Sequence, residues 1–147
     1  LAEMMRNIQL HFAYRVKQEQ KQIVLSGPNQ VSLFCDRDWL MEAIDNLVKN
    51  ALDHTQKGDT VRMEWRALPN LVQVYVRDNG SGIHPEDLHH IFKRFYRSRF
   101  SKDQQGIGLG LPLAKMIIEA HSGTIEVDST PGAGTVFTIN FLIPTKL

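Results

Sequence analysis

The chain has little of the features that mark several protein classes. Its single cysteine, Cys35, excludes an intrachain disulfide and fits a reducing compartment. Its net charge is only +1, which gives no global attraction to nucleic acid or to anionic membranes. No apolar run approaches the roughly 20 residues that span a bilayer, and no signal peptide is visible. The chain starts in mid-pattern at Leu1, so we expect it to be a fragment of a longer protein.

What is present is typical of one soluble globular domain. The chain has 147 residues, of which 42% are hydrophobic and 22% are charged. This length is sufficient to bury a substantial core. We find no internal repeat, no low-complexity segment and no linker between domains.

Hydrophobic spacing predicts three long helices, over residues 3–21, 36–54 and 109–120, and a short helix over 85–91. Alternating or short apolar runs predict about six strands, over residues 23–25, 31–34, 60–66, 71–77, 124–128 and 136–142. Residues 93–106 are polar, basic and glycine-ended, which predicts a mobile loop. This tally indicates a two-layer α/β sandwich.

The second predicted helix carries an unusual polar face. At about 100° per residue, one narrow sector contains Glu42, Asn46, Asn50 and Asp53. Asparagine is a poor residue for a helix interior, so two of them need a reason. Amide oxygens are hard neutral ligands, suited to a magnesium ion already carried by phosphates. A plain solvated helix face is the alternative.

Two glycine-rich segments flank the predicted loop. In the first, Asp78 ends a strand and is followed by Gly80, Gly82 and Ile83. A carboxylate accepts hydrogen bonds only, so it can bind the exocyclic amine of adenine and would repel a guanine carbonyl. The second leads into an apolar helix, where backbone amides form an anion site; it contains Gly106, Gly108 and Gly110. An acidic hairpin end and a flexible linker are the respective alternatives.

The predicted loop is basic and aromatic, with Lys93, Arg94, Arg97, Arg99 and Lys102 beside Phe95, Tyr96 and Phe100. Single-stranded nucleic acid is one ligand for such a mixture, but nothing else on the chain extends the basic surface. A loop that closes over a triphosphate explains the same residues. The adjacent pair His89–His90 resembles a metal pair only superficially, because adjacent helical side chains point apart.

Taken in order, these segments resemble the catalytic ATP-binding domain of bacterial two-component sensor histidine kinases. That domain belongs to the superfamily shared with gyrase B, the ATP-driven heat-shock chaperones and MutL. The resemblance covers residues 30–142 and its segments are 46–50 (N box), 78–83 (first glycine box), 92–95 (F box), 106–111 (second glycine box) and 132–135. The phrase over residues 91–97 is specific to the kinases within that superfamily.

The resemblance implies a Bergerat-type fold, a mixed sheet backed by three helices, with ATP bound between the helices and a lid. It implies that Asn50 holds Mg²⁺ with help from Asn46, and that Asp78 hydrogen-bonds adenine at a pocket reached by Ile83 and Thr135. It assigns Tyr96 and Arg97 to the lid. The lid hinge and the phosphate-facing helix start would consist of Gly106, Ile107, Gly108, Leu109, Gly110 and Leu111.

Three positions depart from the family pattern. Asp53 stands where many relatives carry a lysine or arginine near the phosphates, so a positive contact is missing; Lys49 or the lid arginines are the expected substitutes. His54 stands where tyrosine or histidine is usual, and either contacts the nucleotide or has a plain surface role. Ile107 replaces a common threonine or serine.

The acceptor histidine of such kinases lies on a separate dimerisation domain, and no histidine here has the acidic neighbour usual for it. We therefore expect residues 1–21 to be a helical link from that missing domain and residues 22–147 to be the catalytic domain. Glu42 and Asn46 are the candidate catalytic residues, with Glu42 orienting or deprotonating the acceptor imidazole.

By resemblance, the partners are the parent's own dimerisation domain and a response regulator, with no nucleic acid. The parent is expected to be a homodimeric sensor of the bacterial inner membrane, with this domain on the cytoplasmic side; the fragment alone is expected to be monomeric. Two other functions stay open: another ATPase or anti-sigma-factor serine kinase of the superfamily, and a non-catalytic nucleotide-binding module.

Overall fold

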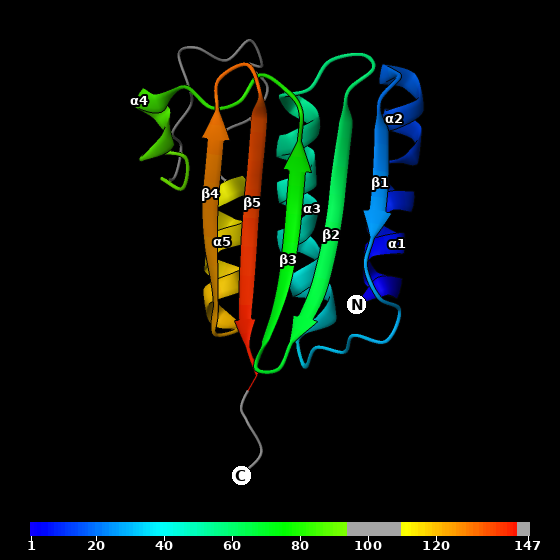
Figure 1. Cartoon of the computed structure of the whole chain (residues 1–147), viewed down its shortest axis with the longest axis vertical. Helices are drawn as coiled ribbons and strands as arrows, with labels where there is room; N and C mark the ends of the chain where they lie inside the picture. The colour runs from blue at the N-terminus through cyan, green and yellow to red at the C-terminus, as the bar shows by residue number, and fades with distance from the viewer. Residues whose placement is uncertain (94–109, 144–147) are drawn as a thin grey trace.

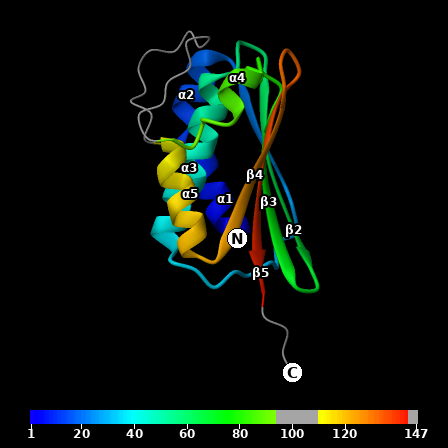
Figure 2. The same ribbon diagram turned by 90° about the vertical axis from the view of Figure 1, so that its left-hand side faces the viewer.

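The computed structural model describes residues 1–93 and 110–143 of the chain. These residues form two layers, a twisted sheet and a layer of helices that covers one of its faces (Figures 1 and 2). The strands are β1 (Gln22–Ser26), β2 (Thr60–Leu68), β3 (Leu71–Asp78), β4 (Gly123–Thr130) and β5 (Gly134–Leu142). The helices are α1 (Ala2–His11), α2 (Ala13–Glu19), α3 (Arg37–Asp53), α4 (Pro85–Leu88) and α5 (Gly110–Ala120).

The sheet is mixed, with strand order β1-β2-β3-β5-β4. Strands β1 and β2 are parallel, and the chain passes between them through α3, as parallel neighbours require a crossover connection. All other neighbouring strands are antiparallel. The two-layer sandwich, the mixed sheet and its backing by three long helical segments are therefore confirmed.

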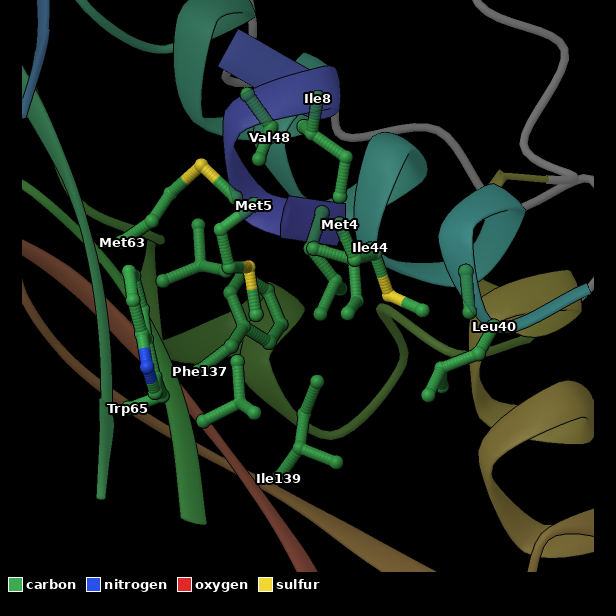
Figure 3. Packing of buried hydrophobic residues seen from close by; sticks show 14 of the residues in the cluster. Met4, Met5, Ile8, Leu40, Ile44, Val48, Met63, Trp65, Phe137 and Ile139 are labelled. Carbon is green, nitrogen blue, oxygen red and sulfur yellow. The ribbon is translucent and has the colours of Figure 1, made fainter. Parts of the chain in front are cut away.

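The core lies between the sheet and the helices (Figure 3). Along β2, β3 and β5 every second side chain is buried, as in a sheet with one covered face. Phe137 and Ile139 of β5 pack there with Met5 and Ile8 of α1 and Ile44 of α3, and all five are fully buried. Each such side chain contributes roughly 1.5–3 kcal/mol through removal of apolar surface from water.

The other face of the sheet is polar. A chain of hydrogen bonds crosses it from Arg66 to Gln73 (2.6 Å) and from Gln73 to Asn140 (2.8 Å), and continues from Asn140 to Thr124 (3.4 Å). The hydroxyl of Tyr75 also donates to Gln73, at 2.8 Å. These side chains come from four neighbouring strands, so polar contacts replace a second layer of helices on this face.

The expected strand over residues 31–34 is wrong. This segment has no strand partner and forms part of the connection from β1 to α3. Its backbone carbonyl at Val31 accepts from the amino group of Leu1 (3.1 Å), and the Phe34 side chain is fully exposed. Its apolar residues matched a strand pattern, but Val31 and Leu33 pack against the core from a connection that pairs with no strand of the described sheet.

The expected single helix over residues 3–21 is two helices, which meet at Phe12. The backbone of Phe12 leaves the helical region there, with φ −101° and ψ 6°. The first piece, α1, buries Met4, Met5 and Ile8 in the core, whereas α2 has no fully buried residue. Residues 2–8 are thus part of the packed domain, and their role as a link to another domain stays a prediction.

Helix α3 begins with a side-chain cap. The carboxylate of Asp36 accepts from the backbone N–H of Trp39 at 3.2 Å, which satisfies one free amide of the first turn. The helix ends at Asp53, and His54 is its C-cap. No helix within the described ranges is both long and apolar enough to cross a membrane.

Candidate nucleotide-binding site

Strand register brings the predicted adenine-binding residues into one row. Asp78 of β3 lies directly opposite Thr135 of β5, and Thr135 lies opposite Ser129 of β4. On the other side of Asp78, its partner in β2 is the fully buried Val61. The row therefore changes from apolar to polar at Asp78, at the upper edge of the sheet in Figure 1.

Asp78 is a buried carboxylate, with 7% of the residue exposed. Burial raises the pKa of Asp78, and backbone hydrogen bonds from Gly80 and Thr135 and the nearby His54 only partly offset that effect. The Gly80 N–H donates to the carboxylate at 2.9 Å. A carboxylate that is costly to bury and only partly compensated is typical of a ligand-binding site.

The turn after Asp78 is fixed against the end of α3. Both the N–H and the hydroxyl of Ser81 contact the His54 carbonyl, at 3.1 and 3.4 Å. Gly80 is required at this contact, because a Cβ there would lie 2.2 Å from the same carbonyl oxygen. This contact ties the predicted adenine end of the site to the asparagine-bearing helix.

Ser129 is a site residue that the sequence analysis missed. Its hydroxyl accepts from the Ile83 N–H (2.7 Å) and contacts the Thr135 hydroxyl (2.9 Å) and the Gly134 carbonyl (3.2 Å). It thus positions Ile83 and Thr135 together. The signal was present: Ser129 continues the inward stripe of Ile125 and Val127 on β4, where a hydroxyl interrupts an apolar pattern.

The asparagine helix presents the expected polar face. Asn46 and Asn50 are half-buried, whereas Glu42 and Lys49 are exposed. Asn46 faces the first residue of α5, since a Cβ on Gly110 would lie 3.3 Å from the Asn46 Oδ1. The Nδ2 of Asn46 is buried and has no hydrogen-bond partner among the described residues. Such a group normally has a partner, so this amide fits a site completed by a ligand.

The residues present suit a magnesium ion that arrives with phosphates. Carboxamide oxygens are hard neutral ligands, and Mg²⁺ is usually held by few protein groups together with substrate phosphates. Within residues 1–93 and 110–143 no group of three or more His, Cys, Asp or Glu side chains gathers as a metal cage. The asparagine pair therefore fits a metal–nucleotide complex better than a free metal ion.

Lys49 is not a free substitute for the missing cation at position 53. Its ammonium group pairs with the Asp53 carboxylate at 3.1 Å, one turn along the same helix. The other oxygen of Asp53 binds the guanidinium of Arg15, from α2, at 2.7 Å. Arg15 is the second residue missed by the sequence analysis, because 38 residues separate it from Asp53.

Other predicted residues fall in three groups. Ile83 and Leu111 are half-buried, and Leu111 packs against the core. Gly82 has a positive φ of 78°, in the turn after Asp78. Tyr96, Arg97, Gly106, Ile107, Gly108 and Leu109 lie outside the described residues, together with most of the predicted loop.

A pocket of about 390 Å³ opens at the row of Asp78 and Thr135, and both residues line it together with Ser129. Most of its walls come from side chains on the polar outer face, such as Arg62, Arg77 and Asp128. The pocket thus shares Asp78 and Thr135 with the predicted adenine end of the site, but none of Asn46, Asn50 and Gly110 lines it.

Comparison with known proteins shows the family to which the chain belongs. Residues 35–145 match the family model described as histidine kinase-, DNA gyrase B-, and HSP90-like ATPase. The sensor histidine kinase YvrG of Bacillus subtilis (strain 168) is 36% identical over 118 residues, covering 80% of this chain and 20% of YvrG. The sensor protein SrrB of Staphylococcus aureus (strain NCTC 8325 / PS 47) is 39% identical over 111 residues, covering 74% of this chain and 19% of SrrB. The chain thus spans about a fifth of the length of these relatives.

The catalytic domain of histidine kinase ThkA has the same fold, with a TM-score of 0.84 over 97% of this chain and 95% of that chain, at 24% identity. ThkA has also been solved in complex with the response regulator TrrA. The match to the family model covers most of the chain and includes both the asparagine helix and the Asp78 turn. The chain belongs to the family of histidine kinase-, DNA gyrase B- and HSP90-like ATPases.

Proposed function

We propose that this domain binds ATP with Mg²⁺ against the polar face of α3 and the start of α5, beneath the predicted lid, and donates the γ-phosphoryl group to a histidine on another domain. The observation that carries the proposal is the contact of the Gly80 turn with the end of α3. This contact holds the buried carboxylate of Asp78 at one end of a helix whose polar face bears two half-buried carboxamides.

In this proposal Asp78 accepts from the exocyclic amine of adenine, and Thr135 and Ile83 line the same pocket. The buried position of Asp78 supports this role, because a carboxylate away from water discriminates strongly between a donor and an acceptor. Gly80 and Gly82 let the turn lie close to the carbonyls of His54 and Thr130, which holds Asp78 and Ile83 in place. His54 stays a candidate contact, since it neighbours Asp78 at the helix end.

Asn50, with Asn46, would hold Mg²⁺ bound to the phosphates. When bound, the ion neutralises charge on the β- and γ-phosphates. Gly110 and Leu111 begin α5 beside Asn46, and their backbone amides suit phosphate oxygens. Tyr96, Arg97, Gly106, Ile107, Gly108 and Leu109 stay predicted members of the lid and hinge.

The transfer step breaks the bond between Pγ and its bridging oxygen, forms a bond between Pγ and an imidazole nitrogen, and releases ADP. The imidazole loses its N–H proton, and Glu42 is the candidate acceptor or orienting group. Glu42 is exposed one turn before Asn46, where a histidine supplied by another domain can approach it. Positioning and charge neutralisation supply most of the rate enhancement in such transfers.

The parent protein supplies the remaining parts of the proposal. We infer a sensor kinase of the bacterial inner membrane that dimerises through helices upstream of residues 1–21 and passes the phosphoryl group to a response regulator. The similarity to two bacterial sensor proteins and to ThkA, which binds a response regulator, supports this inference.

Two measurements test the proposal. Calorimetric titration should show saturable, Mg²⁺-dependent binding of ATP and much weaker binding of GTP. ATP at about 100 times its dissociation constant should raise the free energy of unfolding by about 2.7 kcal/mol. In the second measurement, γ-labelled ATP is mixed with this domain and the histidine-bearing domain of its parent.

Label on that histidine is the expected result. Label on a serine, or steady hydrolysis without any acceptor, would instead indicate another enzyme of the superfamily. Tight ATP binding with no transfer would indicate a non-catalytic module. Absence of ATP binding would refute the nucleotide site itself.

A further inference from the structure

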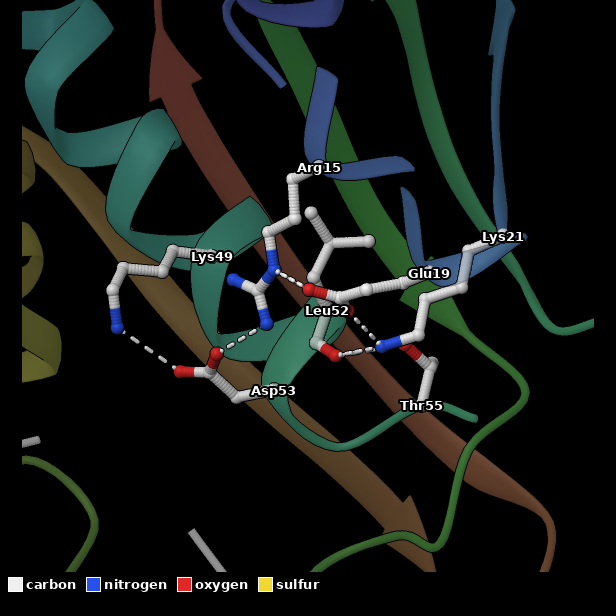
Figure 4. Close-up of polar contacts among 7 residues, drawn as sticks. All are labelled: Arg15, Glu19, Lys21, Lys49, Leu52, Asp53 and Thr55. Carbon is white, nitrogen blue, oxygen red and sulfur yellow. Dashed lines mark hydrogen bonds and ion pairs between the residues drawn. The ribbon is translucent and has the colours of Figure 1, made fainter. Parts of the chain in front are cut away.

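Asp53 is the centre of a charge network that joins α2 to the asparagine helix (Figure 4). One carboxylate oxygen accepts from Nη2 of Arg15 at 2.7 Å, and the other accepts from Nζ of Lys49 at 3.1 Å. The Asp53 side chain is 16% exposed and that of Arg15 is 29% exposed, so this part of the network is mostly removed from solvent.

Helix α2 is held firmly in this position. Glu19 accepts from Arg15 Nε at 2.7 Å and from Lys21 Nζ at 2.7 Å. The ammonium group of Lys21 also donates to the carbonyl of Leu52 at 2.6 Å, and the Lys21 side chain is only 7% exposed. The guanidinium of Arg15 therefore lies between two carboxylates, that of Glu19 on α2 and that of Asp53 in the last turn of α3.

The network is anchored on the same sector of α3 as the predicted metal ligands. Asp53 shares the sector of α3 that contains Asn46 and Asn50, and it is three residues after Asn50. Three cations (Arg15, Lys21 and Lys49) face two carboxylates (Glu19 and Asp53), which leaves an excess of one positive charge. Arg15 has five N–H donors, of which these two carboxylates engage two.

We propose that Arg15, held by Asp53, is a phosphate-binding residue of this domain and supplies the cation that the family pattern carries on α3 itself. Asp53 acts as a positioning residue that aims the guanidinium and keeps Lys49 beside it. The inference rests on the proposed nucleotide site. It also explains how an acidic side chain is tolerated beside a triphosphate: its charge is already neutralised by two cations.

The test compares the affinities of adenosine, ADP and ATP for Arg15→Met, which removes the charge and keeps an apolar stem. We expect affinity for ATP to fall about tenfold, the equivalent of about 1.4 kcal/mol, affinity for ADP to fall less, and affinity for adenosine to stay unchanged. Lys17→Met is the matched control, because Lys17 is an exposed cation on the same helix and its loss changes the net charge equally.

The variant Asp53→Asn separates two accounts of Asp53, because they predict opposite changes in ATP affinity. If Asp53 were only an acid near the phosphates, its neutralisation would strengthen ATP binding. If it positions Arg15, the variant should bind ATP more weakly, because the guanidinium exchanges a charged acceptor for a weaker neutral one and keeps Glu19 as its one carboxylate partner in the network. Stronger binding by Asp53→Asn, or equal loss of adenosine and ATP in Arg15→Met, would overturn the proposal.

Folding is checked by thermal denaturation of each variant. If Arg15→Met does not fold, Arg15→Lys takes its place. Lysine keeps the positive charge but cannot bind both carboxylates and a phosphate, so we expect an intermediate loss of ATP affinity. Full retention of ATP affinity by Arg15→Lys would contradict the proposal. Failure of the native domain to bind any adenine nucleotide would refute the proposed function instead. Normal ATP binding by both the native domain and Arg15→Met would refute this inference alone.

Discussion

Replacing Asp78 by asparagine should separate the cost of burying a carboxylate from its use in binding. The side chain is buried and already accepts from the backbone N–H groups of Gly80 and Thr135. An asparagine oxygen can still accept the hydrogen bond that Gly80 donates to Oδ1, so the turn should keep its shape. What changes is the charge and the second oxygen, which the variant replaces with an NH₂ donor that faces the amine of adenine.

The two expected effects have opposite signs. Loss of a hydrogen bond between adenine and a charged acceptor costs roughly 1.5–3 kcal/mol, so the dissociation constant for ATP should rise by about tenfold to 150-fold. Stability without nucleotide should instead increase, because burial raises the pKa of Asp78 and the ionised form therefore disfavours the folded state.

The effect on stability should depend on pH in a defined direction. Asp78 has a higher pKa when folded than the ordinary value of 3.8, so the folded state binds more protons between that value and the raised one. Stability of the native protein should therefore fall as pH rises through this window, and the advantage of Asp78→Asn should grow and then level off. Asp45 also has a pKa raised by burial, but it is common to both proteins.

The assays are calorimetric titration with ATP and denaturant unfolding from pH 4 to pH 8. Asp128→Asn is the control, since Asp128 is exposed on β4 and its replacement changes the net charge equally. Unchanged ATP affinity in Asp78→Asn would refute the adenine assignment. A variant less stable than the native protein at neutral pH would refute the account of its buried charge.

Three further predictions concern the fold and are read out by denaturant unfolding. Gly80→Ala should lower the free energy of unfolding by about 1–3 kcal/mol, because its Cβ would overlap the backbone carbonyl at the end of α3. Gly58→Ala should lower it less, because Gly58 has a φ of 91° but no neighbour within 4 Å of the position that an added Cβ would take. Phe137→Ala should cost about 3–5 kcal/mol as a fully buried side chain, and Leu142→Ala, which is 72% exposed, should cost under 1 kcal/mol by the burial argument. Asp36→Ala should cost about 0.5–2 kcal/mol by removing the cap of α3. Equal costs within either pair, or no cost at Asp36, would contradict these accounts.

Sequence patterns were sufficient to predict the elements that pair with the next element along the chain. The hairpin of β2 and β3 was predictable because alternation and a Pro69–Asn70 turn specify both strands and their pairing. The segment 31–34 has the same apolar character, yet it forms no strand, because Val31 and Leu33 pack against the core from a connecting segment, and local pattern does not distinguish that role from a strand. The break at Phe12 was also invisible, since the four-residue spacing of apolar positions continues through it without glycine or proline.

The candidate site divides in the same way. Asp78, Asn46 and Asn50 were identified from residue type and spacing, and strand register explains why Thr135 lies beside Asp78. Arg15 carries no such signal, because its meaning comes entirely from a contact with Asp53 in a distant helix. The sequence shows that an acidic residue, Asp53, replaces the basic residue of many relatives, but only the structure shows that Arg15 of α2 pairs with it.

The central pairing of β3 with β5 has a consequence for how the domain tolerates change in length. Everything from Asn79 to Ala133, including α4 and α5, is one excursion between two adjacent strands. Closing such an excursion becomes only about 0.6 kcal/mol more costly when its length doubles. Insertions in this excursion that fall outside α5 and β4 therefore leave the pairing of β3 with β5 intact, so the part of the domain predicted to cover the nucleotide can diversify while the sheet that carries Asp78 stays the same.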